Sequence, residues 1–439
     1  MKTLISLSNR MMQRYLPDPL IFVFILTLVV FLLGLAVTPA SPAEMVRYWG
    51  GGFWGLLTFA MQMVLVLVTG HVLASSPIIK SLLGKTATLA KSPGSAIVLV
   101  TLVSLIASWI NWGFGLVIGA LFAKELAKRV TNVDYRLLIA SAYSGFVIWH
   151  GGFSGSIPLT IATPGHFSED IIGVIPTSET IFAPYNLIII AAIFIVLPIL
   201  NRFMMPSKEE TVTVDPQLLE ESLPAVAVEQ NKKLTPAEWL ENSPIVSVVV
   251  FILGLFFIIF YFGDSGKLNL DIVNFLFLFL GILLHWRPKN FLQAVANAVK
   301  GAGGIIIQFP FYAGIMGMMT ASGLAVWFAE IFIQISNETT FALFTFWSAG
   351  IVNIFVPSGG GQWAVQAPVT LEAATSLGVP AAKAAMAVAW GDAWTNMIQP
   401  FWALPALAIA GLKAKDIMGF CVIVCVVTGV IISLGLLLF

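Results

Sequence analysis

The stretch NIFVPSGGGQWAVQAP (353–368) places a proline, a serine and three consecutive glycines inside an apolar region of the chain. Glycine and proline are the poorest helix formers. The hydrocarbon layer of a membrane offers no water to freed N–H and C=O groups, so irregular backbone survives there only when it is buried in protein or lines an aqueous cavity. The stretch therefore predicts the tip of a re-entrant hairpin, spanning 341–377, at a functional site.

The composition around this stretch is that of a membrane protein. Of 439 residues, 58% are hydrophobic and 10% are charged, and the mean hydropathy is +0.94. Soluble domains carry about 25% charged residues. Runs such as 19–38 and 420–439 have the roughly 20 apolar residues that cross a bilayer. Equal numbers of acids and bases, with no polybasic tract, argue against nucleic-acid binding.

The placement of lysine and arginine predicts the topology. We expect an all-α polytopic membrane protein with about nine transmembrane helices, two re-entrant hairpins and two broken helices. The N-terminus is predicted to be cytoplasmic and the C-terminus periplasmic. The expected organisation is an N-terminal interfacial helix (1–18), a first membrane repeat (19–201), a cytoplasmic linker (202–243) and a second membrane repeat (244–439).

An internal repeat relates the two halves. A shift of 247 residues places 111–165 on 358–412 and superposes Gly113 on Gly360. It also aligns a first hairpin tip, NWGFG (111–115), with the opening stretch. The charge bias predicts that the first hairpin enters from inside and the second from outside. Such an inverted repeat places the site at the midplane, where hairpins and broken helices meet.

The predicted site combines two kinds of helix end. The N-terminus after each tip favours an anion, and the last carbonyls before it favour a cation. Candidate coupling-ion ligands are Asn353, Asp392 and Thr395, and the tips could hold Na⁺. Asp392 is a candidate because it is the only acid near the middle of a predicted broken helix. The candidate substrate-binding residues are Asn111, Gly113, Gly115, Ser154, Ser156, Ser358, Gly359, Gly360, Gly361, Gln362, Asn396 and Gln399.

Structural roles compete with these assignments. Polar side chains in membranes often make interhelical hydrogen bonds, and Gly115 could serve close packing alone. His150, in the other predicted break, is as consistent with a structural role as with a proton relay. No lysine or arginine falls deep within a predicted element, so the substrate should be small, singly charged and partly apolar. No complete enzyme or metal-ligand motif is present, and no cofactor is expected.

Several long motifs give the chain a family resemblance. WGGGFWGLLTFAMQM, NWGFGLVIGA, GGFSGSIPL, IQFPFYAGIMGMM, VPSGGGQWAVQAP and QPFWALPALAIAGL resemble the AtoE-type short-chain fatty acid transporters of bacteria. The resemblance covers nearly the whole chain. It implies an inner-membrane carrier of acids such as butyrate and acetoacetate, and it brings no residue-level site assignment.

The functional expectation is a secondary active transporter that works by alternating access and is coupled to H⁺ or Na⁺. Its partners would be the monocarboxylate, the coupling ion, the lipid bilayer and, in a homodimer, a second copy. The alternatives are an ion-coupled dicarboxylate carrier, a cation/proton antiporter and a channel. A membrane enzyme is the remotest alternative.

Overall fold

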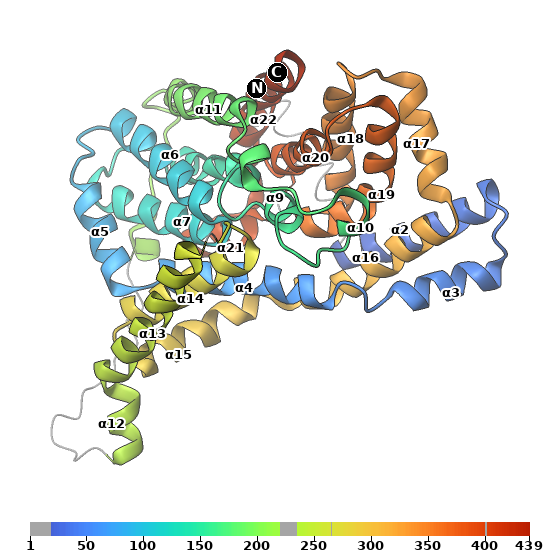
Figure 1. The fold of residues 1–439 in the computed structure, drawn as a ribbon. Coiled ribbons are helices and arrows are strands. Elements are labelled where there is room, and N and C mark those ends of the chain that lie inside the picture. The colour runs from blue at the N-terminus through green and yellow to red at the C-terminus, as the bar shows by residue number, and fades with distance from the viewer. Residues whose placement is uncertain (1–18, 220–234, 265, 400–401) are drawn as a thin grey trace.

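The computed structural model describes residues 19–219, 235–264, 266–399 and 402–439, and all regular elements in these ranges are helices (Figure 1). This confirms the predicted all-α class. The expected interfacial helix over 1–18 lies outside the described residues. Six described helices are long and apolar enough to cross a membrane: α4 (Leu57–Ala74), α6 (Pro93–Ile110), α11 (Pro184–Phe203), α13 (Pro244–Gly263), α16 (Gly303–Ala321) and α22 (Ala414–Leu438).

Shorter helices complete the fold. Apolar segments of α2 (Pro19–Val37), α14 (Leu270–Leu284) and α18 (Phe341–Phe355) are shorter than a full span. The connecting elements are α3 (Pro42–Gly52), α5 (Pro77–Ala87), α10 (Glu169–Ile172), η2 (Thr177–Glu179), η3 (Pro216–Leu219), α12 (Pro236–Asn242), α15 (Pro288–Ala298), η4 (Val299–Gly301) and α17 (Leu324–Ile335).

The helices of the two hairpins are interrupted at the predicted tips. The first joins α6 to α7 (Trp112–Arg129) through Asn111, and the second joins α18 to α19 (Gly359–Leu377) through 356–358. Asn111 (φ −155°, ψ 128°) and Ser358 (φ −156°, ψ 108°) share one extended conformation. The Asn111 side chain accepts from Phe114 N at 2.9 Å, and that of Ser358 from Gly361 N at 3.4 Å. Each tip is therefore a capped helix start.

Two broken helices accompany the hairpins. The first runs from α8 (Tyr135–Ser144) into the 3₁₀ helix η1 (Gly145–Gly151) and resumes as α9 (Ser156–Ile161). The second consists of α20 (Ala381–Thr395) and α21 (Ala403–Ala410), with non-helical backbone at the described residues between them.

The predicted 247-residue shift also relates the element bounds. Adding 247 to Trp112 and Ser156, the starts of α7 and α9, gives Gly359 and Ala403, the starts of α19 and α21. The starts of α3, α4, α5, α6 and α8, shifted in the same way, fall within one residue of those of α15, α16, α17, α18 and α20. The order of elements is therefore repeated from α3 to α9 and from α15 to α21.

Helices of the two halves pack against each other. α7 packs against α21, α19 packs against α9, and η1 packs against α20. In Figure 1, α9 lies beside α19 and α20. The Tyr135 hydroxyl donates to Ala410 O at 3.0 Å, and the Tyr143 hydroxyl donates to Asn396 O at 2.7 Å. Each broken helix thus lies against the hairpin of the opposite half.

Three helices differ from the sequence expectation. Residues 42–52 were not predicted as a helix but form α3, which a capping box between Ser41 and Glu44 starts. α5 and α17 were not expected as separate helices. α16 ends at Ala321, because Gly323 adopts a positive φ of 82° and the separate helix α17 follows.

Candidate transport site

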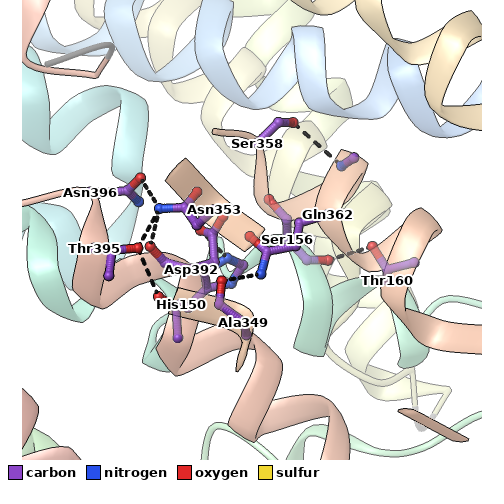
Figure 2. Close-up of polar contacts among 12 residues, drawn as sticks. His150, Ser156, Thr160, Ala349, Asn353, Ser358, Gln362, Asp392, Thr395 and Asn396 are labelled. Atoms are coloured by element: carbon purple, nitrogen blue, oxygen red, sulfur yellow. Dashed lines mark hydrogen bonds and ion pairs between the residues drawn. The ribbon is translucent and has the colours of Figure 1, made fainter. Parts of the chain in front are cut away.

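A buried acid–base pair joins the two halves. His150 in η1 places Nε2 3.0 Å from Asp392 Oδ2 in α20, and neither side chain is exposed at all (Figure 2). A buried ionised carboxylate is costly unless it is paired and hydrogen-bonded. In the contacts that the structure describes for this pair, no lysine or arginine takes part. Within these contacts His150 is therefore the basic partner of Asp392.

An amide connects this pair to the second hairpin. Asn353, near the end of α18, directs Nδ2 to Asp392 O at 2.9 Å, Thr395 Oγ1 at 2.9 Å and Asn396 Oδ1 at 3.0 Å (Figure 2). Gln399 Nε2 donates to the same Asn396 oxygen at 2.9 Å. The residues predicted as coupling-ion ligands, with two of the predicted substrate residues, thus form one buried network. We call His150, Asn353, Asp392, Thr395, Asn396 and Gln399 the polar cluster.

The second tip is enclosed by side chains at close range. A Cβ atom on Gly359 would lie 2.4 Å from His150 Nε2, and one on Gly361 would lie 2.4 Å from Tyr312 Cε2. A Cβ atom on the adjacent Gly360 would likewise meet the rings of Phe59 and Phe309. The three glycines therefore allow direct contact between the start of α19 and its neighbours, which a side chain would prevent.

Gln362 follows these glycines and anchors the helix that they begin. Its Nε2 donates to Ala349 O at 2.8 Å and to Gln366 Oε1 at 2.7 Å. Within the described structure, Gln362 Oε1, Asn353 Oδ1 and His150 Nδ1 are buried polar atoms without a hydrogen-bond partner. Such atoms are uncommon in folded proteins, and an ion or a water molecule is one kind of partner that can satisfy them.

The first tip is fixed by hydrogen bonds and glycine contacts that involve backbone atoms on at least one side. Trp112 N donates to Ser154 Oγ at 2.8 Å, and Phe153 N donates to Trp109 O at 2.8 Å. A Cβ atom on Gly113 would meet the backbone of Leu67, and one on Gly115 would meet both the hydroxyl and the backbone of Ser108. The predicted residues at this tip therefore hold α6, α7 and the first break together.

Residues of η1 separate the two tips. The Trp149 ring lies 5.9 Å from the Trp112 ring of the first tip, and its edge contacts Gly359 of the second. Ser156 begins α9 on the other side of the break and accepts a hydrogen bond from Thr160 Oγ1 through its carbonyl (Figure 2). A ligand held between the tips would consequently contact Trp149 or His150.

A cavity of about 390 Å³ approaches both tips. Trp402 reaches the first tip, since its ring lies 5.1 Å from that of Trp112. Gln308 leads to the second, because its Oε1 accepts from the Tyr312 hydroxyl at 3.4 Å. The lining residues are mostly apolar or glycine: Leu20, Gly301, Gly303, Gly304, Ile305, Ile307, Gln308 and Trp402.

His150 is the site residue that the sequence indicated least clearly. It lies 242 residues from Asp392 in the chain. The repeat offers one signal, because the 247-residue shift places Asp392 on Gly145, five residues before His150. Among the described residues, no three His, Cys, Asp or Glu side chains come together as metal ligands. A Na⁺ site at the tips remains a prediction.

Comparisons with known proteins agree with this architecture. A family model described as "Short chain fatty acid transporter" matches residues 1–439. Two relatives named "Putative short-chain fatty acid transporter" are similar over nearly their whole lengths. The one from Escherichia coli (strain K12) is 48% identical and covers 98% of both chains, and the one from Haemophilus influenzae is 45% identical and covers 97% of this chain and 96% of its own.

A solved structure shares the fold. The YdaH transporter of Alcanivorax borkumensis, whose crystal structure is described as having an unusual topology, superposes with a TM-score of 0.58. The match covers 96% of this chain and 97% of that one, at 16% sequence identity. At this level of identity the likeness extends to the fold alone.

Proposed function

The chain belongs to the short-chain fatty acid transporter family, and from this premise we propose that it carries monocarboxylates such as acetoacetate and butyrate across the bacterial inner membrane by alternating access, coupled to H⁺ or Na⁺. Membership makes it a multi-pass membrane transporter rather than an enzyme. One observation carries the proposal: a capped helix start and a buried carboxylate meet at His150, with no lysine or arginine in the contacts described there.

The substrate carboxylate binds at the first turn of α19. The first N–H groups of a helix have no intrahelical partners, and the helix dipole favours an anion there. Ser358 caps this helix start and supports its geometry. The glycines at the start of α19 pack against His150 and Tyr312. Substrate entry therefore requires the second hairpin tip to move away from η1.

The acyl chain extends toward the 390 Å³ cavity. Its volume is many times the roughly 30 Å³ that one water molecule occupies in the liquid. Ile305, Ile307 and Trp402 provide apolar contacts, and Gln308 is a polar side chain at its border. This arrangement suits a small acid with one charged end and one apolar end, as opposed to a dicarboxylate.

The coupling cation binds at the polar cluster. Asp392 is fully buried, and an intramembrane acid favours a proton or a metal cation near it. The inverted orientation of the repeats, the cytoplasmic N-terminus and the periplasmic C-terminus belong to the same proposal. Opposed hairpins would expose the site to alternate sides of the membrane.

Counterflow tests the proposal. Proteoliposomes preloaded with unlabelled acetoacetate should take up labelled acetoacetate faster than protein-free liposomes and beyond the outside concentration, because a carrier exchanges the two pools. Butyrate should compete and succinate should not. A channel would show no such overshoot. Competition by succinate as strong as that by butyrate would favour the dicarboxylate alternative, and proton flux without any carboxylate would favour an antiporter.

A further inference from the structure

His150 touches both the proposed coupling group and the proposed substrate site. Its Nε2 lies 3.0 Å from Asp392 Oδ2. The edge of the ring that carries Nε2 and Cε1 faces Gly359, where a Cβ atom would lie 2.4 Å and 2.7 Å from those two atoms. The remaining ring nitrogen, Nδ1, is buried and has no partner in the described structure. Nε2 thus lies beside both Asp392 and the start of α19, and Nδ1 is the next ring atom beyond Cε1, to which it is bonded.

The protonation state of this ring decides whether it can bind a carboxylate. Neutral imidazole has one N–H and one lone pair, whereas the imidazolium ion has two N–H donors. With Nε2–H donated to Asp392, the Nδ1 of neutral His150 is an acceptor and repels a carboxylate oxygen. A proton on Nδ1 converts it into a donor for that oxygen.

The charge count leads to the same conclusion. A substrate carboxylate at α19 would add a second buried negative charge beside Asp392, and like charges in one site disfavour each other. One proton on His150 offsets the added charge, so the site carries a net charge of −1 both when empty with neutral His150 and when loaded. Substrate and proton thus bind together more favourably than separately, which is a coupling free energy.

Other titratable groups near the pair do not replace it. Among the described residues, Tyr143 on α8 and Tyr312 on α16 interact electrostatically with Asp392, and Cys421 on α22 interacts with Tyr143. Phenols and thiols are largely neutral near pH 7. The imidazole and the carboxylate are therefore the groups that can exchange a proton during transport.

We propose that H⁺ is the coupling ion and that His150 links it to the substrate, holding Asp392 through Nε2 and the substrate carboxylate through Nδ1–H. This inference rests on the proposed function and adds to it the identity of the coupling ion and the atom that carries it. The proton enters from solvent on Nδ1 and leaves to solvent when the substrate is released.

Proton uptake on binding tests this assignment. In weakly buffered detergent solution near pH 7.5, sodium acetoacetate brings almost no protons of its own, so a pH indicator reports only what the protein takes up. We expect up to one proton per carrier for the wild type and none for His150→Gln, which keeps a donor but cannot titrate. Asp392→Asn should also take up none. The exposed-loop control His166→Gln, whose Nε2 contacts Gly173 O, should match the wild type.

Counterflow separates failure of this inference from failure of the proposed function. His150→Gln should exchange acetoacetate more slowly than the wild type, because it loses the Nδ1–H donor, and its rate should no longer vary with pH between about 6 and 8. Proton uptake that persists in this variant, or wild-type binding that takes up no proton and is strengthened by Na⁺, would overturn the inference and leave the carrier intact. Proton uptake by the wild type tests the inference by itself, even if both variants fail to fold. Wild-type protein without counterflow would instead refute the proposed function.

Discussion

The two hairpin tips have the same backbone and different surroundings. Asn111 and Ser358 adopt nearly identical dihedral angles and cap equivalent helices. The first tip is held by backbone groups, including the bond from Phe153 N to Trp109 O. The second is held by the side chains of the polar cluster and by the rings around its glycines. Contacts between backbones fix a structure, whereas a side-chain network can change with protonation.

The two halves also carry different residues at positions that the repeat makes equivalent. The 247-residue shift places Asn353 on Ile106 and Asp392 on Gly145. The first half therefore forms its hairpin and its broken helix without the amide and without the acid. This difference between the halves supports our proposal that Asn353 and Asp392 serve transport. We infer that the first hairpin is a scaffold and the second is the moving, ligand-binding element.

The largest effect is expected where the scaffold is tightest. In Gly152→Ala the new Cβ would lie 2.1 Å from Trp109 O, a backbone atom that cannot rotate away. Overpacking typically costs about 1–3 kcal/mol, and a clash with backbone lies at the upper end of that range. We expect a melting temperature in detergent lower by about 3 °C. Gly84→Ala is the control, since its Cβ would have no neighbour within 4 Å. Equal melting temperatures for the two variants would show that the first tip is not rigid.

Asn353→Ile makes the second hairpin resemble the first and should affect transport more than folding. Thr395 would keep its bond to Gly350 O, and Asn396 would keep its bond from Gln399. We expect acetoacetate counterflow to fall by about 100-fold, which corresponds to about 2.7 kcal/mol, with folded protein still recovered. Asn201→Leu removes a buried amide that bonds Thr101 and Ser144, away from the cluster. A similar loss of transport in this control would point to general destabilisation.

The two caps allow a direct test of the division of roles. Loss of an N-cap costs about 1 kcal/mol, so Asn111→Ala and Ser358→Ala should lower stability by similar amounts. Only Ser358→Ala should also raise the KM for acetoacetate, by about fivefold, because it caps the helix that binds the carboxylate. Initial rates of acetoacetate transport give the KM of each variant, and thermal unfolding gives its stability. A larger KM change in Asn111→Ala would exchange the proposed roles of the tips.

The smallest effect is expected in the cavity, which approaches both tips and so should not distinguish them. Ile305→Ala widens the apolar lining without touching the polar cluster. One methylene in an apolar pocket is worth about 1–3 kcal/mol at most, and a partly open cavity gives less. We expect competition by pentanoate to strengthen about threefold relative to butyrate. An unchanged ratio would place the acyl chain elsewhere.

Local signals explain why the sequence predicted the hairpins and breaks. The PSGGG tip is a helix breaker that can be read without tertiary information. The NWGFG tip was found from the charge pattern and the length of its segment. α3 was missed although Ser41 and Glu44 form a readable capping box.

Long-range contacts explain what the sequence could not predict. The pairing of His150 with Asp392 joins elements 242 residues apart and has no periodic signature. The grouping of Asn353, Thr395 and Asn396 depends on how α18 packs along α20. Predicted residues at the first tip have structural contacts that only coordinates reveal. The predicted substrate and ion assignments remain untested.

The interlocking of the halves has a consequence for biosynthesis. The bond from Tyr135 to Ala410 O joins residues 275 positions apart, and that from Tyr143 to Asn396 O joins residues 253 positions apart. The ribosome must therefore complete most of the chain before either tyrosine meets its partner. The first half waits in the membrane as an unfinished unit, and the last quarter of the chain completes its assembly.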